Sequence, residues 1–245
     1  MKPIGIVQHE ADVGPGNFEL HLQQRALPYQ IVRIDAGDRM PASAEPYAGL
    51  CSLGGSMSVN DALPWVDHEL ALLRDADARG VPVIGHCLGG QLLAKALGAQ
   101  VTRAPYLEMG WAPVELGDAA LAREWLGADA GNIEYFQWHG DMFELPAGAR
   151  RILTSRWCAN QAYIVPRTGF AHVGMQFHIE MTPELVRNWA ADPHAASEID
   201  AERRRTGGPA VQSPDEMRQS LKERAARLQR VAAHLYDRWL RSARA

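Results

Sequence analysis

Cysteine is scarce in the 245-residue chain, which contains only three. Cys51, Cys87 and Cys158 are an odd number and lie far apart, which argues against a disulfide framework and against a zinc site built on cysteines. The histidines outside the motifs described below show no ligand spacing, and no phosphate-binding loop of the Gly-x-x-x-x-Gly-Lys type occurs. The sequence therefore predicts no metal and no cofactor, and it fits a reducing compartment.

Long hydrophobic runs are missing as well. The apolar run near the N-terminus, 4–7, is shorter than the core of a signal peptide. The longest stretches without a charged residue, 46–60 and 80–94, fall short of a bilayer span and contain Gly, Pro, Ser or His. We therefore expect a cytoplasmic protein that has no membrane partner.

Positive charge is scarce over most of the chain. The net charge is -4, but residues 203–245 carry +7 and residues 1–202 carry -11. A body this acidic argues against a nucleic-acid partner, because phosphate backbones bind to basic surfaces. The basic C-terminal segment fits a helix that lies on the acidic body or faces solvent.

The pattern of hydrophobic residues is typical of an α/β fold. Short apolar or β-branched runs alternate with stretches of helical period, as in α/β units around a mainly parallel sheet. A helix is expected from Leu63 to Gly80 and another from Leu88 to Leu97. Strands are expected at 4–7, 31–34, 48–53, 81–84, 111–116, 133–138, 151–155, 162–165 and 171–177. The second half is thus richer in strands than the first.

Three parts are expected along the chain. Residues 1–190 form the main domain, and residues 191–212, which mix Asp, Pro, Ser, Gly and three arginines, read as a linker or mobile loop. Residues 213–245 begin with a capping box and carry one continuous apolar stripe, which predicts a C-terminal amphipathic helix. Its apolar face packs on its own domain or on a second copy in a homodimer, and the sequence leaves both open.

The segment around Cys87 carries the strongest chemical signal. A buried strand runs through Gly85 into Cys87 and Gly89 and straight on into a helix, the geometry of a nucleophile elbow. The small residues permit a strained turn that lifts the thiol clear of the sheet. Free N–H groups at the helix start favour the thiolate that attacks. The alternative is a buried core cysteine at a tight turn, and the two flanking glycines favour the nucleophile.

A cysteine nucleophile needs a base and a group that orients the base. His178 and Glu180 follow a predicted strand, and residues two apart in an extended chain point to the same side. The end of that strand is expected at the same edge of the sheet as the elbow, where parallel sheets place their ligands. A His-x-Glu pair by itself is more often found on the protein surface. The catalytic interpretation therefore depends on the pair lying at the same edge of the sheet as the elbow.

With these motifs the chain resembles the class I, triad-type glutamine amidotransferases, and most closely the free-standing proteins similar to the glutaminase domain of GMP synthase. The resemblance covers residues 45–185 well. It implies a flavodoxin-like fold with a C-terminal helical extension and a triad of Cys87, His178 and Glu180. It also implies hydrolysis of glutamine or a γ-glutamyl compound through a γ-glutamyl thioester, with release of ammonia or an amine.

Two further segments match the family. The loop at 52–59 resembles its Gly-Gly-Pro loop, which implies an oxyanion hole made by backbone N–H groups of Gly55 and Leu88. The resemblance also implies substrate contacts, and these fall on Gln91, His139, Gly140 and Asp141. His139 taken alone would be a hydrogen-bonded structural histidine, and Glu108 suggests no role beyond packing.

The chain departs from the family at three positions. Ser56 stands where proline is usual, which is expected to loosen the oxyanion loop, and Ile179 and Gly90 replace a usual proline and histidine without removing a functional group. No synthetase domain follows, so we expect either an autonomous hydrolase or a glutaminase that needs a synthetase partner in trans.

Other functions fit less well. In a dienelactone-type hydrolase the acid precedes the histidine, whereas Glu180 follows His178. A peptidase or chaperone with only a cysteine elbow would lack the downstream pair. A non-catalytic partner-binding protein of the same fold would need a damaged triad, and all three residues are present.

Overall fold

The computed structural model describes residues 1–243 and contains one large sheet and one small sheet. The large sheet has the strand order β2-β1-β3-β4-β10-β9-β8-β6, parallel from β2 to β10 and antiparallel from there to β6. Its strands are β1 (Ile4–Gln8), β2 (Tyr29–Arg33), β3 (Gly49–Ser52), β4 (Val83–His86), β6 (Glu115–Leu116), β8 (Arg150–Thr154), β9 (Ala162–Arg167) and β10 (Phe170–Met175). The small sheet pairs the antiparallel strands β5 (Val101–Pro113) and β7 (Glu134–Phe143). The expected mainly parallel α/β fold is confirmed.

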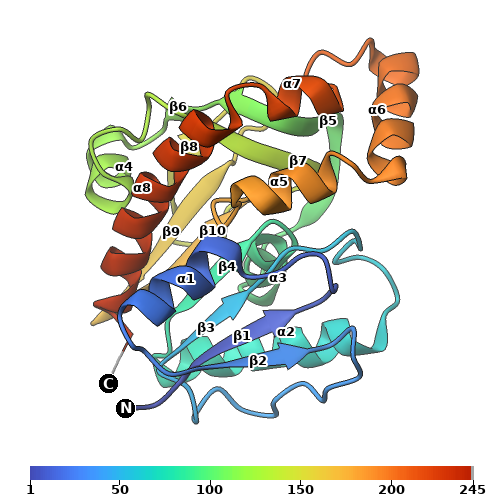
Figure 1. The fold of residues 1–245 in the computed structure, drawn as a ribbon. Helices are drawn as coiled ribbons and strands as arrows, with labels where there is room; N and C mark the ends of the chain where they lie inside the picture. The colour runs from blue at the N-terminus through green and yellow to red at the C-terminus, as the bar shows by residue number, and fades with distance from the viewer. Residues whose placement is uncertain (244–245) are drawn as a thin grey trace.

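Helices cover both faces of the large sheet (Figure 1). Alternate residues of β1 point to opposite faces, so Ile6 joins the apolar core under α1 and α8 while Val7 joins the core under α2 and α3. The helices are α1 (Gly16–Gln24), α2 (Pro64–Arg79), α3 (Leu88–Ala96), α4 (Ala119–Leu126), α5 (Pro183–Trp189), α6 (Pro193–Thr206), α7 (Pro214–Arg218) and α8 (Leu221–Leu240). None of the helices within residues 1–243 has both the length and the apolar character that a bilayer crossing needs.

The expected linker or mobile loop at 191–212 is wrong over most of its length, because α6 occupies 193–206. The side chain of Asp192 accepts a hydrogen bond from the backbone N–H of His194, and Pro193 occupies the first turn. Gly207 ends the helix in the left-handed conformation. The sequence contains these helix start and stop signals, but the polar composition of the segment favoured a loop over a helix.

The C-terminal helix also differs from expectation, because it is broken into α7 and α8. The capping box at Ser213 and Glu216 starts α7, and the chain then turns at Ser220, whose φ is 49°. The expected segment 213–245 extends to two residues, 244–245, that lie outside the described part of the chain.

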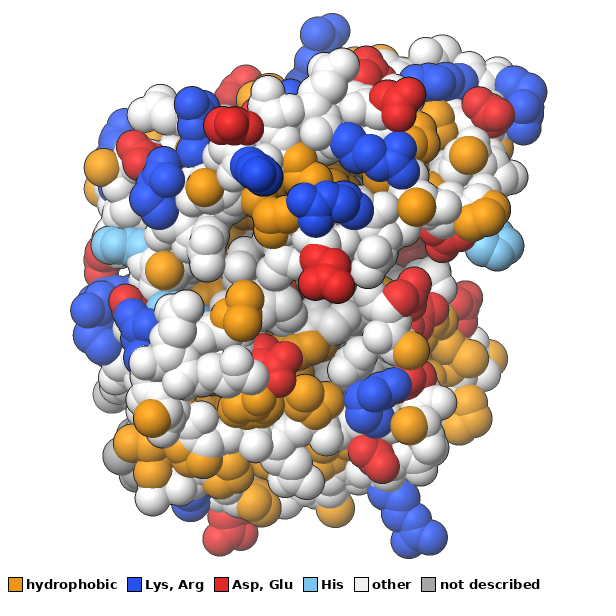
Figure 2. All heavy atoms as spheres, viewed as in Figure 1, with side chains coloured by type: hydrophobic (Ala, Val, Ile, Leu, Met, Phe, Trp, Pro, Cys, Tyr) orange, Lys and Arg blue, Asp and Glu red, His pale blue; other side chains and the backbone are white. Residues whose placement is uncertain are grey.

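The apolar face of α8 packs on its own domain, against α1, α4, β7 and β10. Trp239 is fully buried beside Gly49 of β3, and Phe18 of α1 contacts its ring edge to face. On the polar side, Arg224 pairs with Glu134 at 2.9 Å, so the basic helix lies on acidic groups of the body. Figure 2 shows Lys and Arg side chains interspersed with acidic ones over the surface that α6, α7 and α8 form.

We predict that Trp239→Ala lowers the free energy of unfolding by about 3–5 kcal/mol, because removing a fully buried indole leaves a cavity between α8 and the sheet. Urea unfolding followed by circular dichroism measures the change. Arg227→Ala, at an exposed position of the same helix, is the matched control and should change stability by less than about 0.5 kcal/mol. Equal losses in the two variants would contradict the packing described here.

Candidate active site

Cys87 lies in a strained turn between β4 and α3. Its backbone has φ 48° and ψ -108°, a conformation that costs free energy and is held by its surroundings, here by a 2.9 Å hydrogen bond from its N–H to the carbonyl of Met175. A Cβ on Gly85 would lie 2.4 Å from the carbonyl oxygen of Gly89, and one on Gly89 would lie 2.0 Å from that of Ser52. Only glycine fits at these two positions, as the elbow motif indicated.

His178 and Glu180 lie at the same edge of the sheet as Cys87, because β10 pairs in parallel with β4. The Nδ1 atom of His178 donates to Oε1 of Glu180 over 2.6 Å, and both side chains are buried. Burial alone would lower the pKa of His178, but the Glu180 carboxylate and the Cys87 sulfur outweigh it and raise that pKa to about 10. The structure thus brings the three predicted residues together.

A second histidine lies behind the carboxylate, and no sequence pattern indicated its place. The Nε2 atom of His86 lies 4.0 Å from Oε2 of Glu180 and 3.4 Å from the hydroxyl oxygen of Tyr236 on α8. Burial lowers the pKa of His86. Burial would raise the pKa of Glu180, but His178 and His86 outweigh the effect of burial and lower that pKa. The C-terminal helix therefore reaches the surroundings of the acid through Tyr236.

The predicted oxyanion loop lies against the start of α3. A Cβ on Gly55 would lie 3.0 Å from the side chain of Leu88, and the N–H of Gly89 donates to the carbonyl of Leu53 over 3.0 Å. Ser56 does not loosen the loop. Its N–H and its hydroxyl both donate to the carboxylate of Glu10, at 2.9 and 2.5 Å, and proline could make neither bond.

The four residues expected to contact substrate line the cavity that also holds Cys87 and His178. Gln91 is buried and donates to the carbonyl of Asp141 over 3.4 Å. The Asp141 carboxylate accepts from Ser58 over 2.6 Å and lies 3.5 Å from Arg103. Asp141 is thus held beside the oxyanion loop, and its neighbour Gly140 lies at the cavity wall.

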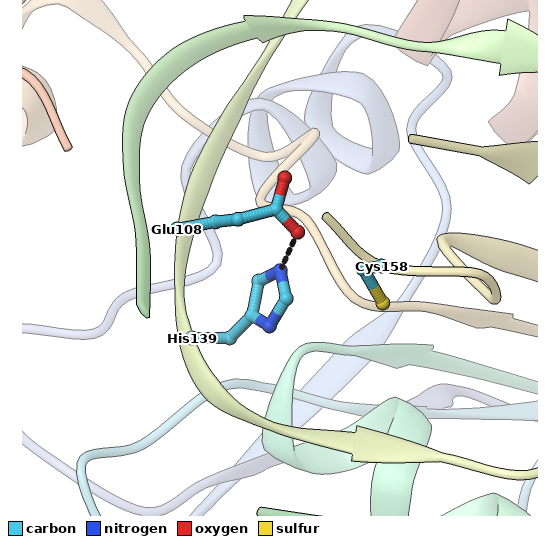
Figure 3. Close-up of side chains that lie close together, drawn as sticks. All are labelled: Glu108, His139 and Cys158. Atoms are coloured by element: carbon cyan, nitrogen blue, oxygen red, sulfur yellow. Dashed lines mark ion pairs between the residues drawn. The ribbon is translucent and has the colours of Figure 1, made fainter. Parts of the chain in front are cut away.

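His139 points into a buried polar cluster (Figure 3). Its Nε2 atom lies 3.2 Å from Oε2 of Glu108, and ligand atoms of Glu108, His139 and Cys158 all lie within 4.8 Å of one another. Such a trio has the donor types that zinc prefers. However, the Glu108 carboxylate already accepts from Ser155 at 3.0 Å and Gln161 at 2.9 Å, and the Cys158 thiol donates to a backbone carbonyl. The cluster fits a hydrogen-bonded support for His139 better than a metal site.

The cavity has a volume of about 610 Å³ and opens beside Cys87. Part of its wall comes from α5 and α6, including Trp189 and Glu198, and the indole N–H of Trp138 lies 3.4 Å from the Glu198 carboxylate. This size falls in the range of small-molecule sites. The segment expected to be a linker therefore forms one side of the site.

Comparisons with known proteins point to one family. The sequence profile of glutamine amidotransferase class-I matches residues 17–188. A glutamine amidotransferase-like protein of Salmonella typhimurium, YfeJ, is 31% identical over 75% of this chain and 77% of its own. GMP synthase of Rhodopseudomonas palustris is 28% identical over 69% of this chain, which spans only 31% of that relative. The crystal structure of a glutamine amidotransferase from Methylobacillus flagellatus superposes with a TM-score of 0.91 at 43% identity, covering 100% of this chain and 96% of that one.

We predict that a thiol reagent modifies Cys87 much faster than the other two cysteines. Cys87 lines the cavity, whereas burial raises the pKa of Cys158 to about 12 and that of Cys51 well above its usual value. Peptide mass spectrometry after brief iodoacetamide treatment should show one adduct, at Cys87, and none there in Cys87→Ala. Faster labelling of Cys51 or Cys158 in the folded protein would overturn the assignment.

Proposed function

Because the chain belongs to the class-I glutamine amidotransferase family, we propose that it hydrolyses the side-chain amide of glutamine or of a γ-glutamyl compound, with Cys87 as nucleophile. The observation that carries the proposal is the strained elbow of Cys87, which opens into the same cavity as His178. Glu180, hydrogen-bonded to His178, orients the imidazole.

The reaction proceeds in two halves. The Cys87 thiolate attacks the amide carbon, and His178 gives its proton to the departing nitrogen as the C–N bond breaks, which leaves a γ-glutamyl thioester and ammonia or an amine. Water then attacks the thioester, His178 accepts a proton, and glutamate leaves as the C–S bond breaks. The N–H groups of Gly55 and Leu88 stabilise the oxyanion in both halves.

The cavity supports a substrate larger than free glutamine. Gln91, Gly140 and Asp141 hold the end with the α-amino and α-carboxylate groups, which every γ-glutamyl compound shares. The cavity extends from Cys87 to α5 and α6, and we expect a larger leaving group to occupy that part. We therefore favour a γ-glutamyl amide or peptide as substrate.

A second candidate is a glutaminase that works with a synthetase in trans. The observation that favours it is the similarity to GMP synthases, which are named as glutamine-hydrolysing and which this chain matches over about a third of their length. In that case the ammonia passes to a partner, and the protein alone has little activity.

Assays with glutamine and a panel of γ-glutamyl peptides and amines separate the two candidates. We predict that the isolated protein hydrolyses at least one γ-glutamyl amide with a higher kcat/KM than glutamine, because that ratio reports discrimination in the transition state. Ammonia, amine and glutamate are the products measured. Cys87→Ala and Cys87→Ser should abolish turnover with the fold retained. Inertness toward the whole panel, with activity restored by a co-purifying synthetase, would favour the subunit instead.

A further prediction concerns the role of Glu180. Glu180→Gln should slow turnover much less than His178→Ala, because the proton donor remains and only its alignment suffers. The same change should move the fall of kcat/KM at alkaline pH to lower pH. Glu180 makes the largest contribution that raises the pKa of His178, so without it the imidazolium loses its proton earlier. An unchanged pH profile, or losses equal to those of His178→Ala, would assign the carboxylate another role.

A further inference from the structure

A buried histidine that directly follows β1 contacts the oxyanion loop. The Nδ1 atom of His9 lies 3.0 Å from the carbonyl oxygen of Gly54. A carbonyl oxygen only accepts hydrogen bonds, so Nδ1 carries the proton and donates. On the other side of the loop, a Cβ on Gly54 would lie 2.8 Å from the ring of His178. The Gly54–Gly55 peptide therefore lies between two imidazole rings.

The bond from His9 fixes which way the next N–H points. In a trans peptide the C=O and the following N–H point in opposite directions, and no described peptide bond is cis. Since the carbonyl of Gly54 points to His9, the N–H of Gly55 points away from His9, and Gly55 is one of the residues that line the cavity. A glycine pair has little intrinsic preference between the two orientations of this peptide, so an outside contact has to select one.

Glu69 on α2 holds His9 in place. Its Oε2 atom lies 2.7 Å from Nε2 of His9 and its Oε1 atom accepts from the Ser52 hydroxyl over 2.6 Å. The side chains of His9 and Glu69 have no exposed surface. Trp65 packs on the imidazole of His9, with the two ring centroids 4.9 Å apart. Burial would lower the pKa of His9, but the Glu69 carboxylate and the Gly54 carbonyl outweigh the effect of burial and raise that pKa. His9 therefore keeps its donor toward Gly54.

We propose that His9 is a positioning residue for catalysis, which selects the peptide orientation in which the Gly55 N–H can stabilise the oxyanion, and that Glu69 orients His9. The proposal rests on the proposed function, because it concerns the transition state of attack by Cys87. The geometry supports this role, because the pair of Glu69 and His9 is buried and ends in the bond to the Gly54 carbonyl.

Two substitutions at His9, to Asn and to Gln, test whether its hydrogen bond to Gly54 positions the oxyanion loop. Asn places its amide nitrogen where His has Nδ1, so His9→Asn keeps the donor to Gly54, whereas Gln places its nitrogen near Nε2, so His9→Gln keeps only the contact with Glu69. We expect His9→Gln to lower kcat by about 10- to 100-fold with KM within about twofold, since losing one oxyanion donor outright costs about 10²- to 10³-fold. His9→Asn should recover most of that loss.

The rate of Cys87 alkylation by iodoacetamide separates the oxyanion hole from the thiol, because alkylation forms no oxyanion. It should stay within about twofold of wild type in both variants. His68→Gln, at an exposed position of α2 next to Glu69, is the control for a histidine change that touches neither group. Melting temperatures confirm that each variant is folded.

Each other outcome overturns the inference. Equal kcat values in His9→Gln and His9→Asn, or a loss confined to KM, would mean that the donor to Gly54 does not matter for the chemical step. A parallel loss of alkylation would place the effect on the thiol. Failure of the proposed function is distinguishable from failure of this inference, because in that case the wild-type protein hydrolyses neither glutamine nor any γ-glutamyl compound of the panel.

Discussion

Strand β4 lies between β3 and β10, and the site depends on this position. A central strand of a parallel sheet has neighbours whose carboxyl ends lie at the same edge, so Cys87 receives the oxyanion loop from β3 on one side and His178 from β10 on the other. The hydrogen bond from the Cys87 N–H to Met175 joins the elbow directly to β10. A shift of one residue in either pairing would separate Cys87 from His178 or from the loop at 52–59.

The charged groups around this edge are arranged in buried pairs. Glu180 is paired with His178 and Glu69 with His9. His178 lines the cavity beside Cys87, and the other ring nitrogen of His9 donates to the carbonyl of Gly54. Buried carboxylates without partners would be expensive, and here each has at least one hydrogen-bond donor. Some acidic residues of the chain, Glu69 and Glu180 among them, are therefore buried in hydrogen-bonded pairs.

Much of the fold and part of the site followed from local patterns in the sequence. The Gly-x-Cys-x-Gly turn and the His-x-Glu spacing are local, and the parallel order of the strands brings them together. His9, Glu69, His86 and Tyr236 gave no such signal, because their contacts join residues 45 to 150 positions apart. Helix α6 was missed for a different reason, since its polar composition outweighed clear capping signals at Asp192 and Gly207. Ser56 was misjudged because its partner, Glu10, comes from another strand end.

The position of α8 has a consequence for the order in which the site is assembled during synthesis. Chains emerge from the ribosome with the N-terminal segments first, and these segments begin to fold before the rest is made. The elbow, the oxyanion loop and His178 all precede α8, yet Tyr236 and Trp239 cover the sheet next to His86 and Gly49. The growing chain therefore contains Cys87, the loop at 52–59 and His178 before it contains the helix whose Tyr236 lies beside His86, so the packing behind these residues is completed last.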